Sequence, residues 1–537
     1  MSEKKRDGFV FGALILSFSG LITKIAGLIF RVVLTRMIGG SADVINGITT
    51  VDATMSHFSS AYAVYTFLLS LSTSGLPIGI SAMVSRSLAL GKYKDIKTLM
   101  RSVTIIFVSA GGFLTVLGLI FSQPIAMMMN SAETRYCMMY IMPAVFFIAM
   151  VSVFRGFFQG YNNMAPTSVS NLIEAFLKLG AGLGISYIFQ LQGRPAYEIV
   201  AGGILGVTVG TVGACLYMVL KYVFRRKEYR ITLQEFVRDA APTPKSKLLG
   251  EFWKITLPIA LSSVSVQLMG LIDSSVVVQT LKDVMGDLSV AQSYYGAYSN
   301  KATTIFNLPS FFIITIGVSL VPSISAAFAK KDQRAIRYTV NKALRYSSIL
   351  AFACAFGLAA VGTPVVNVIF GGSYDGMGGK LLSVLSLSLV AVGLTNVTSY
   401  MLQAIGKAYL SVISVVVGAL VKSVCTWVLV SIPSINIYGA PIATNIAYPI
   451  MLLINLYFLY KHMHIIPKIR VVFVKPLITG LCCFASAFAV LKVFEGFASE
   501  IIALTAAIFA GAVVYIALLF VLKLVTFDEI KQIFKKS

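Results

Sequence analysis

Charged side chains are scarce in this sequence, and histidine, cysteine and tryptophan are scarcer still. Only 12% of the 537 residues are Asp, Glu, Lys or Arg, whereas soluble domains carry about 25%. The three His and six Cys are scattered without metal-ligand spacing, and no pair of loop cysteines favours a disulfide. We therefore expect most of the chain to lie in lipid, with no metal site and no bound cofactor.

Motifs for nucleotide hydrolysis and for common enzyme chemistry are missing as well. There is no Walker loop, no HExxH sequence and no Ser-His-Asp constellation. A membrane glycosyl- or phosphotransferase, the alternative from the enzyme class, would need clustered loop carboxylates. The loops offer only the scattered Asp43, Asp52, Asp283 and Asp375. We expect a protein that is not an enzyme; a purely structural membrane scaffold is disfavoured by the charges inside the spans described below.

Long apolar runs are what the sequence has in abundance. A bilayer core of about 30 Å needs roughly 20 apolar residues in a helix. Fourteen stretches qualify and predict an all-α integral membrane protein. They are 9–35, 60–84, 101–122, 136–158, 166–190, 197–222, 253–280, 302–325, 346–370, 380–402, 408–431, 438–460, 472–492 and 499–522.

Positive charge alternates between the connecting loops. The net charge of +23 would suggest a nucleic-acid partner in a soluble protein. Here Lys and Arg gather in every second loop, as they do on the cytoplasmic side of membrane proteins. The basic segments are the N-terminus, 86–101, 221–251, 330–345, 461–470 and the C-terminus. We expect a multi-pass protein of the cell membrane with both termini cytoplasmic and no nucleic-acid partner.

Two pairs of similar segments indicate an internal duplication. AMVSRSLALGKYKDIK (82–97) resembles PSISAAFAKKDQRAIR (322–337), and QGYNNMAPTSVSNLIEAFLKL, from Gln159, resembles QAIGKAYLSVISVVVGALVKS, from Gln403. An even number of spans in each copy makes the copies parallel, a common plan of secondary transporters. We therefore expect four parts along the chain. They are an N-lobe (1–222, spans 1–6), a cytoplasmic linker (223–251), a C-lobe (252–462, spans 7–12) and two extra spans with a cytoplasmic tail (463–537).

Charges within the spans are costly and usually face a cavity or a partner. Lys24 and Arg31 lie two turns apart on one face of span 1, whereas Arg36 at its end can reach the headgroups. Glu174 and Lys178 of span 5 stand at an i,i+4 spacing, so a structural ion pair and a cavity role are both open.

The second half of the chain adds further charges of this kind. Lys422 of span 11, which aligns with Lys178, is a cavity candidate, and Lys301 begins span 8, where it can also snorkel. Asp273 of span 7, like Glu174, is a candidate for ion coupling or a counter-ion. The cations outnumber the carboxylates, and such a cavity suits an anion, above all a phosphate or diphosphate.

Four segments carry a resemblance to a known family. They are TKIAGLIFRVVLTRMIG (23–39), STSGLPIGISAMVS (72–85), RGFFQGYNNMAPTSVSNLIE (155–174) and YSNKATTIFNLPSFFIITIGVSLVPSIS (298–325). The chain resembles the polysaccharide-transporter branch of the MOP flippase superfamily, above all the stage V sporulation protein B and MurJ-like lipid II flippases of Gram-positive bacteria. The resemblance implies two six-helix lobes around a V-shaped cavity, alternating access, and an undecaprenyl-diphosphate-linked glycan such as a cell-wall precursor as cargo.

The resemblance also implies residue roles. Basic residues of spans 1 and 8 hold the diphosphate in that family, which carries over to Lys24, Arg31 and Lys301. Two departures stand out, since no basic residue occupies 61–84 and span 11 has Lys422 where some members have acidic sodium ligands. Na+, H+ and the membrane potential remain candidate driving forces. We expect a monomer in contact with membrane lipids, and a multidrug or cation antiporter of the same fold is the alternative, although such carriers prefer acidic cavities.

Overall fold

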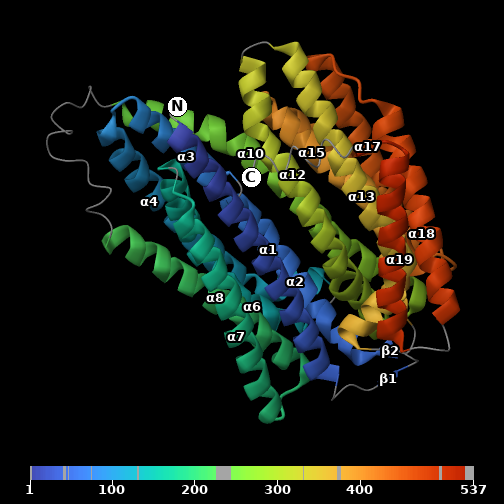
Figure 1. The fold of residues 1–537 in the computed structure, drawn as a ribbon. Helices are drawn as coiled ribbons and strands as arrows, with labels where there is room; N and C mark the ends of the chain where they lie inside the picture. Colours follow the sequence, from blue (N-terminus) through green and yellow to red (C-terminus); the bar gives the residue numbers. More distant parts are fainter. Residues whose placement is uncertain are drawn as a thin grey trace. The chain divides into compact units, whose positions relative to one another are not determined.

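The computed structural model describes residues 3–39, 44–45, 48–73, 75–129, 132–161, 163–224, 243–329, 332–371, 376–494 and 499–525. Contacts divide the chain into two compact units, shown together in Figure 1. Unit 1 comprises Met1–Asp43 and Ala53–Gln279, and unit 2 comprises Val44–Asp52 and Thr280–Ser537.

Unit 1 is built from helices. Its elements are α1 (Glu3–Gly39), α2 (Thr50–Thr73), α3 (Leu76–Ala89), α4 (Tyr93–Ile120), α5 (Ser122–Met128), α6 (Thr134–Gly160), α7 (Ala165–Leu191), α8 (Ala196–Phe224) and α10 (Lys245–Met285). The first three residues of α2 and the last six of α10 belong to unit 2. Apolar residues of α3, α4, α6, α8 and α10, among them Leu76, Leu99, Phe158, Met218 and Phe252, form its largest described core.

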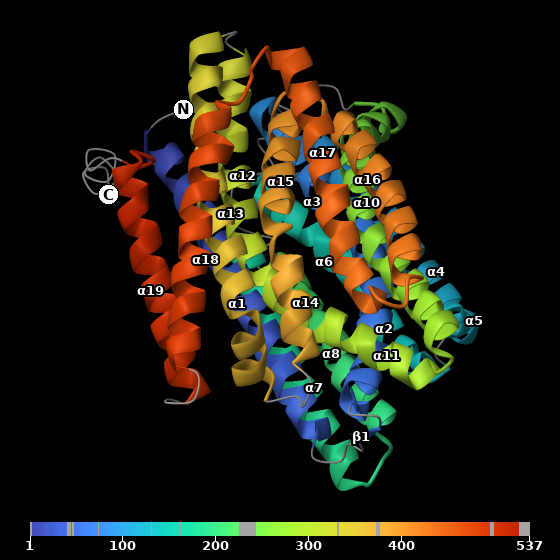
Figure 2. The ribbon, with the colours of Figure 1, turned by 90° about the vertical axis from the view of Figure 1, so that its right-hand side faces the viewer.

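Unit 2 contains the remaining elements (Figure 2). They are β1 (Val44–Ile45), β2 (Ile48–Thr49), α11 (Leu288–Gly296), η1 (Ala297–Ala302), α12 (Thr303–Ala329), α13 (Gln333–Phe370), α14 (Met377–Ser386), α15 (Leu389–Ala404), α16 (Ala408–Val430), η2 (Asn436–Tyr438), α17 (Gly439–Met463), η3 (Arg470–Val474), α18 (Lys475–Phe494) and α19 (Glu500–Val521). The strands form a two-residue antiparallel hairpin, with Val44 opposite Thr49. Apart from this hairpin the described chain is helical, and the all-α prediction is confirmed.

Every predicted span falls on a helix, but two of them are interrupted. Span 60–84 is divided between α2 and α3 near Gly75. Pro77, in the first turn of α3, has no N–H to donate to the carbonyl of Thr73, and its ring would clash with that carbonyl in a continuous helix. Span 380–402 is divided between α14 and α15, which meet at a bend of 48°. Within the described residues, nine helices are long and apolar enough to cross a membrane, or ten if this bent pair counts as one. The crossing of the bilayer by α1, α2–α3, α10 and α12 stays a prediction.

The duplication is visible in the positions of helix ends. Helix α3 ends at Ala89 and α12 at Ala329, while α4 begins at Tyr93 and α13 at Gln333, so both offsets are 240 residues (329 − 89 and 333 − 93). Packing partners repeat as well, because α3, α4 and α7 contact the α6–α8 pair as α12, α13 and α16 contact the α15–α17 pair. Two copies of one helical unit, followed by α18 and α19, account for the order of elements.

The predicted lobe boundaries and the contact-defined units differ. The sequence places the junction in the polar segment 223–251, whereas the contacts change inside the 41-residue helix α10, after Gln279. The hairpin segment Val44–Asp52 also belongs to unit 2. The junction of a duplication lies at the linker between the copies, whereas the residues of one long helix can be assigned to two packed units. The lobes as bodies that move against each other stay a prediction.

Candidate functional site

A group of cations and aromatic rings lies on α1, α2 and α7 of unit 1. The guanidinium carbon of Arg31 is 5.3 Å from the ring centroid of Phe58 and 5.7 Å from that of Tyr62. The ammonium of Lys178 is 4.8 Å from the Tyr62 ring and 5.5 Å from the Phe30 ring. These distances lie within the range of about 6 Å at which a ring face attracts a cation.

Lys24 joins this group from the same face of α1 as Arg31. The charges of Lys178, Lys24 and Arg31 all act on the Tyr62 phenol, with Lys178 the strongest. The side chain of Lys24 is exposed, while Arg31 is half-buried. We call Lys24, Arg31, Lys178, Phe30, Phe58 and Tyr62 the aromatic–cationic cluster. The structure thus brings together three of the five cations that the sequence predicts as ligands.

Close packing of α7 on α8 fixes the position of Lys178. A Cβ atom at Gly206 would lie 2.4 Å from the Cα of Gly182, and one at Gly210 would lie 2.6 Å from the carbonyl oxygen of Glu174 and 3.3 Å from the Cβ of Lys178. Only residues without a side chain allow two helix backbones to approach so closely. The glycines of α8 therefore set how far α7 stands from the core of unit 1.

The carboxylate of Glu174 has a different partner from the one that its spacing suggests. Arg155 of α6 donates hydrogen bonds from Nη2 to Glu174 Oε2 and to Ser170 Oγ, each at 3.0 Å. Of the two possibilities that the spacing leaves open, the ion pair of Glu174 with Lys178 is not formed, because Glu174 pairs with Arg155 between α6 and α7. Lys178 is left with the rings of Tyr62 and Phe30, so its charge is not neutralised by its neighbour on α7.

Lys301, the predicted diphosphate ligand of span 8, is buried in unit 2. It lies in the π-helical turn η1, and its ammonium donates a hydrogen bond of 2.7 Å to Asp52 Oδ2. The two side chains are only 5% and 7% exposed. Asp52 is thus no exposed loop residue, as the sequence suggests, but stands in the first turn of α2 and neutralises Lys301. A buried pair of this kind is costly to break from one side only.

The two remaining predicted residues, Lys422 and Asp273, are both buried. Lys422 lies in α16 of unit 2 and Asp273 in α10 of unit 1, each with 7% of its surface exposed. Lys422 and Lys178 therefore belong to different units, although the two residues occupy matching places in α16 and α7. The roles of Lys422 as a ligand and of Asp273 and Glu174 in ion coupling stay predictions.

A polar contact stands at the N-terminal end of α6. The buried ring of His57 places Nε2 3.2 Å from Glu133 Oε2 and Nδ1 3.3 Å from Thr134 Oγ1. The hydrogen bond with His57 lowers the pKa of Glu133 below its ordinary value, although partial burial of the carboxyl opposes this effect. Within the described residues, no three His, Cys, Asp or Glu side chains come together as a metal site.

Sequence reasoning did not identify Tyr62, Phe58, Phe30, Arg155 or Asp52 as members of these sites. Arg155 lies within a segment that carries the family resemblance, which was a usable signal. The aromatic residues gave none, because a ring in an apolar span is expected to pack against other apolar side chains. Their contacts with cations depend on how α1, α2 and α7 pack against one another.

Comparison with known proteins identifies a family and several relatives. The family model described as lipid II flippase MurJ matches residues 51–509. Stage V sporulation protein B of Bacillus subtilis (strain 168) is 27% identical over 98% of each chain. Lipid II flippase MurJ of the same strain is 21% identical over 84% of this chain and 82% of its own.

Solved structures show the same fold. A structure of lipid II flippase MurJ in an inward closed conformation matches with a TM-score of 0.68 at 16% identity, covering 94% of this chain and 98% of its own. An inward-facing multidrug resistance MATE transporter of the MOP superfamily matches with a TM-score of 0.66 at 15% identity, covering 83% of this chain and 98% of its own.

Proposed function

The chain belongs to the MurJ family of lipid II flippases, and we propose that it carries an undecaprenyl-diphosphate-linked glycan, lipid II or a related cell-wall precursor, across the cell membrane by alternating access. The observation that carries this proposal is the aromatic–cationic cluster. Three positive side chains around one phenol suit a ligand with several negative charges. We infer that Lys24, Arg31 and Lys178 hold the diphosphate.

Arg31 makes the most specific contact in this proposal. Its planar fork matches two phosphate oxygens at once, whereas the ammonium groups of Lys24 and Lys178 act as point charges. Lys301 takes part only when its hydrogen bond with Asp52 opens, because its ammonium is otherwise neutralised. Release of the cargo then requires that these contacts weaken when the protein changes conformation.

A multidrug or cation antiporter is the second candidate, since a MATE transporter shares the fold. The charge of the cluster argues against it. An organic cation would meet Lys24, Arg31 and Lys178, while Glu174, the carboxylate of α7, is already paired with Arg155. Coupling through Na+ or H+ at Asp273 or Glu174 is a proposal that the cluster does not require.

A translocation assay with purified protein in liposomes tests the function. Fluorescent lipid II and other undecaprenyl-diphosphate sugars are compared, with an organic cation as the third cargo. Loss of two charge-assisted contacts in Lys24→Ala/Arg31→Ala should slow flipping at least about tenfold. The control Arg36→Ala, at the exposed end of α1, should stay within about twofold. A well-inserted double variant that flips at the wild-type rate would rule out the cationic site, and transport of the cation alone would favour the antiporter.

A further inference from the structure

Tyr62 stands at the centre of the aromatic–cationic cluster with a free hydroxyl group. Its half-buried side chain contacts Arg31 and Lys178 through the ring face. Within the described residues, its phenol oxygen makes no hydrogen bond to another protein group. A phenol can donate one hydrogen bond and accept others, so a half-buried hydroxyl among cations is left with unused donor capacity.

The ring of Tyr62 attracts the cations of Arg31 and Lys178, as a carboxylate could, but it carries no net charge. Phe58 stacks on it with ring centroids 5.7 Å apart and planes inclined by 16°, and Phe58 also faces Arg31. A ring quadrupole attracts a cation without carrying a net negative charge. The rings therefore contact Arg31 and Lys178 without adding a negative charge of their own to the cluster.

The spacing of the cations suits a diphosphate better than a single phosphate. Lys24 and Arg31 are seven residues apart, which is about 10 Å along the axis of α1. Both act on the Tyr62 phenol, as does Lys178 of α7. An anion whose charge extends over two phosphate groups can reach more of these cations at once than a compact one.

We propose that Tyr62 is a specificity-determining residue of the transport site. Its ring positions Arg31 and Lys178, and its hydroxyl donates a hydrogen bond to an oxygen of the cargo's diphosphate. This inference rests on the proposed function, since it assigns a contact to the same cargo. The Tyr62 hydroxyl adds a neutral hydrogen-bond donor to the positively charged ligands. The site then selects a cargo by the position of a phosphate oxygen as well as by its charge.

Two substitutions separate the roles of the ring and the hydroxyl. Tyr62→Phe keeps the ring and removes only the donor, whereas Tyr62→Leu removes both. The matched control is Tyr65→Phe, one turn further along α2, where the phenol oxygen is fully buried and makes no hydrogen bond within the described residues. Tyr65 is adjacent to Tyr62, with ring centroids 5.7 Å apart, so the control also tests a general loss of a phenol in this region.

Binding of undecaprenyl diphosphate, undecaprenyl monophosphate and inorganic diphosphate to the purified full-length protein provides the measurement. Tyr62→Phe should weaken undecaprenyl diphosphate about tenfold and reduce its preference over the monophosphate, while Tyr65→Phe binds as the wild type does. Tyr62→Leu should weaken both lipids further. Competition by inorganic diphosphate distinguishes recognition of the headgroup from recognition of the lipid chain.

The outcomes separate this inference from the function on which it rests. If the wild type does not bind undecaprenyl diphosphate, the proposed function fails. If the wild type binds and Tyr62→Phe binds equally well with the same preference, the role of the hydroxyl is wrong although the function stands. If Tyr62→Leu matches Tyr62→Phe, the positioning role of the ring is wrong. Tyr62→Phe is nearly isosteric, so the test does not depend on the folding of the leucine variant.

Discussion

At the scale of single residues, the partner of each charged group decides what the group can do. Arg155 and Glu174 neutralise each other between α6 and α7, and Lys301 and Asp52 do so in unit 2. Lys178 faces rings, so its charge can act on a ligand. The presence of charges in the spans is predictable from the sequence. Their partners are not, because a local i,i+4 spacing competes with residues on other helices whose positions only packing determines.

Glu133 provides a prediction on acid stability. The hydrogen bond with His57 lowers the pKa of Glu133 relative to its value of 4.5 in an unfolded chain. A lowered pKa in the folded state means that the contribution to stability is fully present above about pH 4.5 and is lost as the pH falls below it. Glu133→Gln should therefore lower the melting temperature by about a degree or two at neutral pH. The difference from the wild type should shrink below pH 4.5.

Thermal unfolding in detergent between about pH 7 and pH 3.5 measures this effect. Glu198→Gln is the control, since it removes a carboxylate from an exposed pair with Arg194 and leaves the buried His57 ring untouched. A difference between wild type and Glu133→Gln that stays constant across this range would contradict the assigned role of the pair.

At the scale of elements, the helix positions follow from the sequence more closely than the helix contacts do. Apolar length predicts a helix at each of the fourteen stretches, since a bilayer demands that length. The break near Gly75 could have been predicted, because Pro77 is visible in the sequence. The close packing at Gly75 could not, since the distance of 2.5 Å between a Cβ placed there and the carbonyl oxygen of Thr256 in α10 depends on the fold. The close approach of α7 to α8 could not be predicted from the sequence either, because glycines are common in membrane helices for many reasons.

The glycines of α8 lead to a prediction about this approach. In Gly206→Ala the new methyl group would lie 2.4 Å from the Cα of Gly182, and a backbone atom cannot turn aside as a flexible side chain can. The two helices must separate, which should cost about 1–3 kcal/mol of stability. Because Lys178 lies on α7, flipping should slow as well.

Gly180→Ala is the matched control on α7, because a Cβ there would meet nothing within 4 Å. Melting temperature and flipping rate are measured for both variants. A Gly206→Ala protein as stable and as active as Gly180→Ala would show that the close approach of α7 and α8 is not required.

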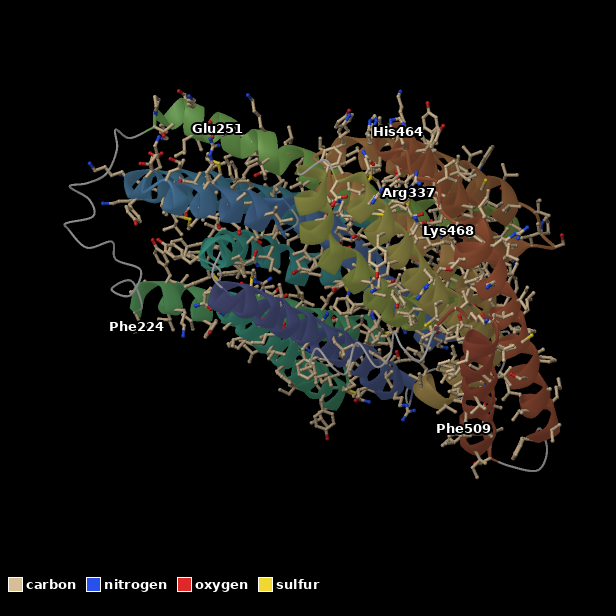
Figure 3. All side chains as sticks on the ribbon, turned by 45° about the horizontal axis from the view of Figure 1, so that its top comes forward. Phe224, Glu251, Arg337, His464, Lys468 and Phe509 are labelled. Atoms are coloured by element: carbon tan, nitrogen blue, oxygen red, sulfur yellow. The ribbon has the colours of Figure 1, made fainter. Side chains whose placement is uncertain are left out.

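At the scale of the whole molecule, the duplication and the basic loops together predict the orientation in the membrane. In unit 1 the backbone and hydroxyl of Thr243 both donate to Asp95, and Arg86 donates to Glu251 at 2.8 Å. The start of α10, where Glu251 is labelled in Figure 3, therefore lies at the same end of unit 1 as the turn between α3 and α4. The predicted cytoplasmic segment 86–101 and residues 243–251 of the predicted cytoplasmic segment 221–251 therefore meet there.

Unit 2 shows the same agreement. Ile336 near the start of α13 and Met463 and Ile465 at the end of α17 belong to one buried cluster. The neighbouring Arg337, His464 and Lys468 lie at this end of unit 2, away from Phe509 of α19 (Figure 3). The predicted cytoplasmic segments 330–345 and 461–470 thus share one side of their unit. The folded contacts support, within each unit, the grouping of loops that the distribution of Lys and Arg suggests.

Labelling of single cysteines from outside the cell tests the orientation, in a protein whose six native cysteines are replaced. Ser246 at the start of α10 is exposed and belongs to the basic side, so Ser246→Cys should stay unlabelled in intact cells and react after lysis. Ser434, exposed in the turn between α16 and α17, belongs to the opposite side, and Ser434→Cys should react in intact cells. Ser373, predicted on the same outer side, lies outside the described residues, and Ser373→Cys should behave as Ser434→Cys does. The reverse pattern would place both termini outside and would contradict the predicted orientation. Equal labelling of Ser246→Cys and Ser434→Cys in intact cells would contradict the alternation of loops itself.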